Sequence, residues 1–430
     1  MQKGQSIRNP RARQRALLIS AGPDEPDLRE LSELLRTAGV AVAGEMTQKR
    51  QNPDPDRYFG KGKLAELKAA IKAADANLVA VDDELAPRQE RNLEEAIGTP
   101  VIDRTAVILD IFADHAGSAE GKLQVELAQL EYNMARMRGL WTHLERLGGA
   151  TGGGIATRGP GETQIETDRR LARSRIAALR RRLERTAGTR QTMRNERERA
   201  GLPTVALAGY TNTGKSTLLN ALTGAEVGVR DRLFHTLDPT TRSFEIAGRT
   251  YLMTDTVGFI RKLPHQLVEA FGATLEEALG ADLLVHVADA SAPEEELDDM
   301  LSAVEDVLEE IGAGERPVVL ALNKIDAVDD EGRRELSFRF PEAVQVSAVS
   351  GDGLDALREA VEERFLAALR PMELLVPYAN GGSLSDLHDV AGEVEREDTA
   401  EGVHVHARVP AAAAARFERF ALNGNGASST

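Results

Sequence analysis

A glycine-rich segment near the middle of the chain has the residue types and spacing of a phosphate-binding loop. Residues 204 to 217 read TVALAGYTNTGKST: an apolar stretch, Gly209, four residues, then Gly214, Lys215 and Ser216. In such a loop, backbone N–H groups and the N-terminus of the next helix bind a β-phosphate. The lysine reaches the β- and γ-phosphates, and the serine hydroxyl binds Mg²⁺. The residues expected to line the nucleotide are Gly209, Tyr210, Thr211, Asn212, Thr213, Gly214, Lys215, Ser216 and Thr217.

A second apolar strand delivers a carboxylate and a glycine toward the same phosphates. In YLMTDTVGF, residues 251 to 259, Asp255 is followed three residues later by Gly258. We expect Asp255 to hold Mg²⁺ through a water molecule. The Gly258 N–H is expected to sense the γ-phosphate, with Thr256 and Val257 lining the site between them.

The third strand predicts which base is bound. PVVLALNKID is an apolar strand that ends in Asn323, Lys324, Ile325 and Asp326. The Asp326 carboxylate can accept hydrogen bonds from guanine N1–H and from its 2-amino group, which adenine lacks. Asn323 would support the base edge. Ser347, Ala348 and Val349, in VQVSAVSGDG, suit the loop whose backbone N–H meets guanine O6. The sequence therefore predicts guanine rather than adenine.

The segment DRLFHTLDPTTR, residues 231 to 242, lies where a nucleotide-sensing switch is expected. A threonine here should close over Mg²⁺ and the γ-phosphate, and Thr236, Thr240 and Thr241 all compete for this role. The residue types alone do not choose among the three.

One position shapes the expected rate of hydrolysis. In Ras-like enzymes a glutamine orients the attacking water, whereas Phe259 follows the glycine here. Because a phenyl ring cannot hydrogen-bond to that water, unassisted turnover is expected on the order of 10⁻⁴ to 10⁻² s⁻¹. A backbone group, a switch side chain or a partner must place the water. His235 and His265 are candidates, although surface histidines usually have no catalytic role.

Upstream of these motifs, residues 15 to 112 alternate between strand-like and helix-like stretches. That alternation is typical of a small, mostly parallel sheet covered by helices. Within it, YFGKGK could bind an anion through Lys61, Lys63 and backbone N–H groups at a helix start. The alternative, an ordinary strand-to-helix turn, is favoured.

Two heptad-patterned stretches follow, joined by a glycine-rich loop. The first seam consists of Leu123, Leu127, Leu130, Met134, Met137, Trp141 and Leu144; the second consists of Ala172, Ile176, Leu179 and Leu183. This spacing predicts an antiparallel helical hairpin. The loop ATGGGIATRGPGETQ is no nucleotide cradle, because no Gly-Lys-Ser or Gly-Lys-Thr follows it. It is either a flexible connection or a tip that contacts a partner.

Charge is segregated along the chain rather than evenly mixed. The net charge of −16 would repel a polyanion. Residues 166 to 199, however, hold twelve arginines against five acidic residues, whereas residues 282 to 310 hold eleven acidic residues and no basic ones. The arginine-rich helix is either a solvated face or an RNA-binding face. The candidate RNA contacts are Gly152, Gly153, Gly154, Arg158, Gly159, Arg169, Arg170 and Arg173.

Composition limits the remaining possibilities. The chain has no cysteine, which excludes disulfides, thiol catalysis and thiolate metal sites. No apolar run is long enough for an integral membrane segment. We therefore expect a cytoplasmic monomer, with loose membrane association left open. In the last 60 residues, GVHVHARVP places His404 and His406 on one face of a strand, where a metal site would need further ligands.

Taken together, these motifs resemble the HflX family of translational GTPases over most of the chain. The resemblance is carried by GYTNTGKSTLLNALT, LFHTLDPTTR, DTVGFIRKLPHQLVEAFGATLEE and GGGIATRGPGETQIETDRR. It implies that Thr236 is the magnesium ligand and that Phe234, His235, Thr236, Leu237 and Asp238 line the nucleotide. It also implies binding to the large ribosomal subunit, splitting of stalled ribosomes under heat stress, and insertion of the hairpin loop into rRNA.

The predicted fold class is α/β. A small α/β domain (1–115) precedes a long antiparallel helical hairpin (116–200, tip loop 148–163). A P-loop GTPase domain (201–370) and a small α/β C-terminal domain (371–430) with a disordered tail follow. The predicted catalytic residues are Lys215, Thr236 and Gly258, and the Mg²⁺ ligands are Ser216, Thr236 and, through water, Asp255. The predicted function is a Mg²⁺-dependent GTPase that binds rRNA of the large subunit and splits ribosomes. The alternative is a GTP-gated rRNA-remodelling factor in ribosome assembly.

Overall fold

The computed structural model describes residues 14–23, 27–148, 160–199, 202–225, 233–234, 236–246, 249–262, 264, 267, 279–391 and 394–422. The chain divides into two compact units. The first comprises Met1–Arg185, Asp231–Leu237 and Lys262–Gly272, and the second comprises Thr186–Arg230, Asp238–Arg261 and Ala273–Thr430. Two short segments from the GTPase region therefore group with the N-terminal unit.

The first unit begins with a four-stranded parallel sheet in the order β2-β1-β3-β4. Its strands are β1 (Arg15–Gly22), β2 (Ala41–Lys49), β3 (Leu78–Val81) and β4 (Val101–Asp103). Its helices are α1 (Arg29–Thr37), α2 (Lys61–Ala73), α3 (Pro87–Ile97) and α4 (Arg104–His115). Strands and helices alternate along the chain, as the sequence predicts, and the apolar side chains of β1 and β3 form the core with α2 and α3.

Local sequence signals set where these helices begin and end. Helix α3 has Pro87 at its first position, where a missing N–H does no harm, and ends at Gly98 in the left-handed conformation with φ 72°. Helix α4 begins after Asp103, whose carboxylate accepts a hydrogen bond from the Ala106 N–H at 2.9 Å. At the start of α2, Lys63 pairs with Glu66 of its own helix at 2.8 Å, as in an ordinary helix N-terminus.

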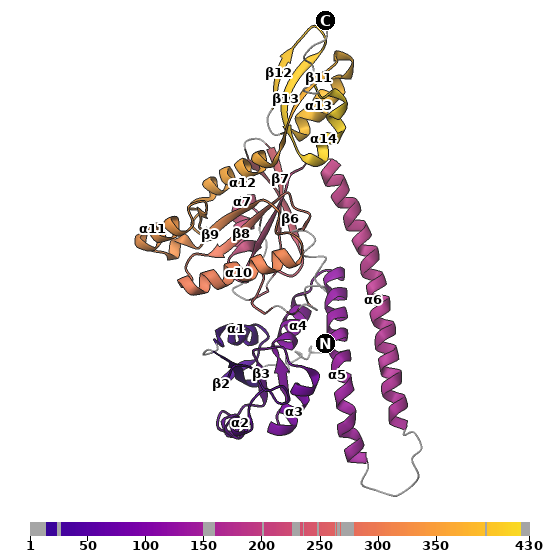
Figure 1. Ribbon diagram of the computed structural model, residues 1–430, viewed down its shortest axis with the longest axis vertical. Coiled ribbons are helices and arrows are strands. Elements are labelled where there is room, and N and C mark those ends of the chain that lie inside the picture. Colours follow the sequence, from indigo (N-terminus) through magenta and orange to yellow (C-terminus); the bar gives the residue numbers. More distant parts are fainter. Residues whose placement is uncertain are drawn as a thin grey trace, which may run out of the picture. The chain divides into compact units, whose positions relative to one another are not determined.

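Helices α5 (Ala119–Gly148) and α6 (Pro160–Arg199) form the predicted hairpin (Figure 1). Leu127, Ile176 and Leu179 are buried in its seam, with Leu123, Leu130, Met134 and Leu183 packed against them. The predicted seam is thus confirmed in this part. Two ion pairs link the helices, Arg175 to Glu126 and Arg180 to Glu131, each at 2.7 Å. The side chains of Met137, Trp141 and Leu144 and the loop residues 149–159 lie outside the described part of the chain.

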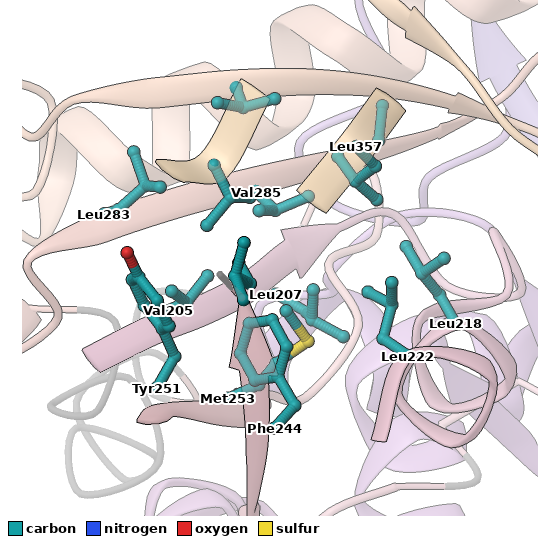
Figure 2. Close-up of a cluster of buried hydrophobic side chains, with 14 of the residues drawn as sticks. Val205, Leu207, Leu218, Leu222, Phe244, Tyr251, Met253, Leu283, Val285 and Leu357 are labelled. Carbon is teal, nitrogen blue, oxygen red and sulfur yellow. The ribbon is translucent and has the colours of Figure 1, made fainter. Parts of the chain in front are cut away.

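The second unit contains a six-stranded sheet in the order β10-β9-β8-β5-β7-β6, parallel except for β6. The strands are β5 (Thr204–Gly209), β6 (Thr240–Ile246), β7 (Arg249–Asp255), β8 (Leu283–Asp289), β9 (Val318–Asn323) and β10 (Val344–Gln345). The helices are α7 (Lys215–Thr223), α10 (Glu294–Glu310), α11 (Asp330–Arg339) and α12 (Leu354–Ala368), and a short 3₁₀ helix, η2, covers Ile325–Ala327. Figure 2 shows side chains of the central strands meeting those of α7 in the core.

Topology fixes where this sheet can bind a ligand. The connection from β5 runs to β6 and β7 on one side, while β8 pairs with β5 on its other side. Ligands of open parallel sheets bind at such a reversal, beyond the carboxyl ends of the strands. The phosphate-binding motif follows β5 at this position.

The C-terminal part is a three-stranded antiparallel sheet in the order β11-β13-β12. It comprises β11 (Arg370–Val376), η3 (Tyr378–Asn380), α13 (Gly381–Val390), β12 (Val394–Asp398), β13 (Val403–Val409), α14 (Ala411–Phe417) and η4 (Glu418–Phe420). Apolar residues of α13 and α14 pack on one face of the sheet. The alternation of GVHVHARVP correctly predicts β13; the charged strand β12 was not predicted. Among the residues that the structure describes, every helix is too short or too polar to cross a lipid bilayer.

Candidate active site

The phosphate loop connects β5 to α7 and needs glycine at two positions. Gly209 has φ 156°, and a Cβ there would lie 2.2 Å from the Val287 carbonyl oxygen of β8. Gly214 has φ 90°, and a Cβ there would lie 2.4 Å from Asn323 Nδ2. Any larger residue would therefore be both strained and in collision. The loop lies directly against β8 and the end of β9.

Lys215 is a buried cation inside this loop. Its side chain is 7% exposed, and Nζ donates hydrogen bonds to the carbonyls of Gly209 and Tyr210 at 3.0 and 2.7 Å. Burial lowers the pKa of Lys215 to about 8, partly offset by the nearby Asp255 carboxylate. A bound phosphate would give this buried ammonium a negatively charged partner in direct contact. The geometry thus fits the predicted role of Lys215.

Ser216 and Asp255 come together beside the loop. Ser216, in the first turn of α7, donates a hydrogen bond from Oγ to Asp255 Oδ2 at 2.5 Å. Asp255 is fully buried at the carboxyl end of β7, next to β5. A hydroxyl and a carboxylate are hard oxygen donors, so these two residues fit Mg²⁺. Thr236 belongs to the other compact unit, and its role as a third ligand stays a prediction.

Gly258 and Phe259 are fastened to the phosphate loop by backbone hydrogen bonds. Thr211 N–H donates to the Phe259 carbonyl at 2.7 Å, and Phe259 N–H donates to the Gly209 carbonyl at 3.1 Å. A Cβ at Gly258 would lie 2.9 Å from Thr211 Cα and 3.0 Å from Lys215 Nζ. The Phe259 ring is 1% exposed. The ring is therefore part of the interior, and this position supplies no polar side chain for an attacking water.

Asn323 has a role that sequence reasoning did not capture. Its side chain is 2% exposed; Nδ2 donates to the Thr213 carbonyl at 2.8 Å, and Oδ1 accepts from Ala348 N–H at 3.0 Å. The amide therefore connects the phosphate loop to the loop predicted to face guanine O6. We assign it first to holding these loops together, in addition to the predicted support of the base edge.

Of the two carboxylates near Asn323, Asp289 is paired with a lysine, whereas Asp326 is exposed and can meet a ligand. Lys324 has φ 64°, and its Nζ pairs with Asp289 Oδ2 at 2.6 Å. Ser347 is fully buried, and its Oγ accepts a hydrogen bond from Ser350 N–H at 3.0 Å. Asp326 is exposed on η2. Asp289 was missed from sequence, although an acidic residue at the carboxyl end of an apolar strand is a recognisable signal.

A buried histidine also lies next to the loop. His286 of β8 is 4% exposed and pairs with Ala208 of β5. Burial, together with the nearby Lys215 charge, lowers the pKa of His286 to about 4. The imidazole is therefore neutral at physiological pH. Sequence reasoning missed this residue, but a lone polar side chain in the strand LLVHVAD could have flagged it.

The predicted switch segment packs within the first unit. Phe234 has φ 56° and is 2% exposed, with its ring edge-on to Phe112 of α4 at 4.7 Å between centroids. Nδ1 of His115, the last residue of α4, lies 2.7 Å from the Phe234 carbonyl oxygen. Leu237 is buried and Thr236 half-buried, whereas Asp238 begins a segment of the second unit. His235 and His265 lie outside the described residues.

A second segment of the GTPase region also packs in the first unit. Lys262, three residues after Phe259, has φ 51°. Its Nζ lies 2.6 Å from Asp83 Oδ1 and 3.3 Å from the Asp82 carbonyl oxygen, at the carboxyl end of β3. This is the reversal point of the first sheet, between β1 and β3. The segment after the γ-phosphate motif is thus anchored on the N-terminal sheet.

The candidate RNA contacts are only partly described. Gly152, Gly153, Gly154, Arg158 and Gly159 lie outside the described residues. Arg169 is half-buried, and Arg170 and Arg173 are exposed on α6. Their contact with RNA stays a prediction.

Comparison with known proteins gives the family. Three family models match consecutive parts of the chain: "GTP-binding GTPase N-terminal" over residues 25–113, "GTP-binding GTPase Middle Region" over 115–197, and "50S ribosome-binding GTPase" over 204–324. The chain is 45% identical over 420 residues to the GTPase HflX of Caldanaerobacter subterraneus subsp. tengcongensis, covering 96% of this chain and 95% of that protein. It belongs to the HflX family of GTPases. To the Escherichia coli GTPase HflX it is 46% identical over 393 residues, covering 90% of each chain.

Membership of the HflX family confirms the predicted fold class and the enzymatic activity. The chain binds GTP and hydrolyses it to GDP and phosphate. Among solved structures, it is 26% identical to a GTP-binding protein of Sulfolobus solfataricus in complex with GDP. That match covers 82% of this chain and 99% of the other, with a TM-score of 0.41.

Proposed function

We propose that this HflX-family GTPase is a slow, Mg²⁺-dependent switch that binds the large ribosomal subunit and, in its GTP form, separates the subunits of stalled ribosomes. The "50S ribosome-binding GTPase" description of the matching model supports the choice of partner. The observation that carries the switch is that Asp231–Leu237 and Lys262–Gly272 group with the unit that also holds most of the hairpin. The first segment contains residues expected to line the nucleotide, and the second closely follows Gly258 along the chain.

In this proposal, the described residues of the second unit bind and orient the nucleotide. Lys215 exchanges its two carbonyl partners for β- and γ-phosphate oxygens, which gives the buried ammonium negatively charged partners in addition to the nearby Asp255 carboxylate. Ser216 and, through water, Asp255 would hold Mg²⁺, which when bound would neutralise charge developing on the phosphates. Asp326 accepts the guanine N1–H and 2-amino hydrogen bonds, and Asn323 fixes the loops on either side.

Slow turnover follows from what surrounds the γ-phosphate position. Gly258 lies on the phosphate loop with no room for a side chain, and the next residue, Phe259, points into the interior. Neither residue can orient a water molecule with a side chain. The missing group is a backbone group, a side chain of the switch segment or a group supplied by the ribosome. We therefore expect the ribosome to stimulate hydrolysis.

Signal transfer in this proposal uses the two anchored segments. Phe234 is held on α4 by its ring and by its carbonyl, and Lys262 is held at the carboxyl end of β3. Helix α4 leads directly into α5 of the hairpin. A change in the switch on γ-phosphate binding or loss would thus act on the element that precedes the hairpin. Such coupling requires that the contacts of Phe234 and Lys262 differ between the GTP-bound and GDP-bound states.

The hairpin would supply the RNA-binding surface. Arg170, Arg173, Arg175, Arg180 and Arg181 are exposed on α6, and of these Arg175 and Arg180 pair with glutamates of α5. Exposed arginines give sequence-independent, salt-dependent contacts with phosphates. The tip residues 150–161 would add shape recognition on rRNA.

Sedimentation of intact ribosomes with the full chain tests this proposal. With a non-hydrolysable GTP analogue we expect the monosome peak to fall and the subunit peaks to rise, and with GDP we expect no change. The same protein without residues 150–161 should bind the analogue normally and leave the monosomes intact. Binding to large subunits without loss of monosomes would instead support the alternative, an rRNA-remodelling role in ribosome assembly.

A further inference from the structure

The face of the C-terminal sheet opposite α13 and α14 gathers histidine and glutamate side chains. On β13 the buried residues Val403, Val405, Ala407 and Val409 alternate with His404, His406 and Arg408. The buried set packs with the two helices, which lie on one side of the sheet (Figure 1). His404 and His406, two residues apart, must therefore point away from the core on the same side.

Strand register brings carboxylates to both histidines. In β11, Glu373 is directly opposite His406. In β12, Glu395 is opposite His406 and Glu397 is opposite His404. Because β13 is the central strand, His406 has an acidic residue opposite it on both sides, whereas His404 has Glu397 on one side and Leu375 on the other. Directly opposite side chains in antiparallel strands have their Cβ atoms about 4.5–5.5 Å apart.

Three of these side chains already converge. His404 Nε2 lies 3.0 Å from Glu373 Oε1, and the rings of His404 and His406 are perpendicular with centroids 4.7 Å apart. One ligand atom from each of Glu373, His404 and His406 lies within 4.8 Å of the other two. Tetrahedral zinc with Zn–N bonds of about 2.0–2.1 Å places its ligands roughly 3.4 Å apart. The side chains are exposed or half-buried, so small rotations suffice to close that difference.

We propose that Glu373, His404 and His406 form a binding site for a borderline transition-metal ion such as Zn²⁺. Two imidazoles and a carboxylate are a zinc ligand set, and imidazole disfavours Mg²⁺ and Ca²⁺, which take oxygen ligands. Glu397, opposite His404 on β12, or a water molecule completes the coordination. The bound ion links β11 to β13 and makes the C-terminal sheet more resistant to unfolding. The site is distinct from the nucleotide pocket, where Ser216 and Asp255 offer only oxygen.

Calorimetric titration of the full chain with ZnCl₂ tests the site, with saturating Mg²⁺ and GDP present to occupy the nucleotide pocket. We expect one equivalent of Zn²⁺ to bind and to raise the unfolding temperature of the C-terminal sheet. His404→Ala, His406→Ala and Glu373→Gln should each weaken binding by about tenfold or more. The matched control is His388→Ala, an exposed histidine of α13 in the same domain, which should bind like the parent.

Three results would overturn the assignment. These are the absence of a stoichiometric binding event in the parent chain, unchanged affinity in both β13 histidine variants, and unchanged affinity in Glu373→Gln. Unchanged affinity in Glu373→Gln would mean that the two histidines bind the ion without Glu373 as the third ligand. The substituted side chains point away from the core, so the variants should fold, and circular dichroism without metal verifies this. GTP hydrolysis is not needed as a readout.

Discussion

Asn323 and Asp326 are three residues apart in one motif, yet they should fail in different ways when substituted. Asn323 is buried and its amide holds two loops, whereas Asp326 is exposed and is expected to meet only the nucleotide. Asn323→Ala therefore perturbs the fold and the pocket together. Asp326→Asn perturbs recognition of the base alone.

The structure sets the size of the first effect. Asn323→Ala leaves the Thr213 carbonyl and the Ala348 N–H without their side-chain partners. An unsatisfied buried polar group costs about 1–3 kcal/mol. Since Ala348 is only half-buried and water can partly replace its partner, we expect unfolding free energy without nucleotide to fall by about 2–4 kcal/mol. GDP affinity should fall as well, without a change in base preference.

Asp326→Asn should leave unfolding free energy within about 0.5 kcal/mol of the parent, because the position is exposed. The asparagine oxygen can still accept from guanine N1–H, but its NH₂ group faces the 2-amino group, so one hydrogen bond to a charged acceptor is lost, which contributes about 1.5–3 kcal/mol. GDP affinity should then fall by about 10- to 10²-fold. The amide can donate to the 2-carbonyl of xanthine, so xanthosine diphosphate should bind this variant better than it binds the parent.

Denaturant unfolding without nucleotide, combined with calorimetry using GDP and xanthosine diphosphate, measures both quantities. Each variant is the control for the other. The reasoning is refuted if Asn323→Ala leaves stability unchanged, or if Asp326→Asn destabilises the fold as strongly as Asn323→Ala does.

Four further predictions concern other parts of the chain. Gly258→Ala should lower unfolding free energy by about 1–3 kcal/mol through overpacking against the phosphate loop, measured by denaturation, and an unchanged value would contradict the close approach. The depressed pKa of His286 means that the unfolded chain takes up a proton below pH 6.5 while the folded chain does so only near pH 4. The unfolding free energy of the parent should therefore fall by on the order of 3 kcal/mol between pH 6.5 and pH 4. The His286→Gln variant should lose less over the same range, and equal losses in the two proteins would argue against a neutral buried imidazole. Lys262→Ala should reduce stimulation by ribosomes at unchanged GDP affinity, whereas weaker GDP binding would place this lysine in the pocket rather than in the coupling. Arg170→Glu with Arg173→Glu should weaken binding to large subunits and flatten its salt dependence, and binding equal to the parent would leave these arginines as a solvated face.

The phosphate loop and the main elements were predictable from sequence because their signals are local. The spacing of Gly209, Gly214, Lys215 and Ser216 after an apolar strand is sufficient for the loop, since glycine is required by its backbone and close packing. The heptad seam of the hairpin was predictable for the same reason: Leu127 belongs to a run of apolar residues three and four apart in α5, and Ile176 and Leu179 belong to a similar run in α6.

Other features depend on contacts distant in sequence and were not predictable. The Asn323 amide reaches Thr213, 110 residues away, and Lys262 reaches Asp83, 179 residues away. Strand β12 was missed because four of its five residues, Glu395 to Asp398, are charged and exposed, and only pairing with β13 makes them a strand. The convergence of Glu373 on His404 is likewise a matter of strand register.

The rate of GTP hydrolysis with and without purified large ribosomal subunits, at several salt concentrations, tests the proposed switch most directly. The account predicts slow hydrolysis by the chain alone and a stimulation of about tenfold or more by large subunits, which declines steeply as salt rises. A rate that is unaffected by large subunits, or stimulation that is insensitive to salt, would contradict it.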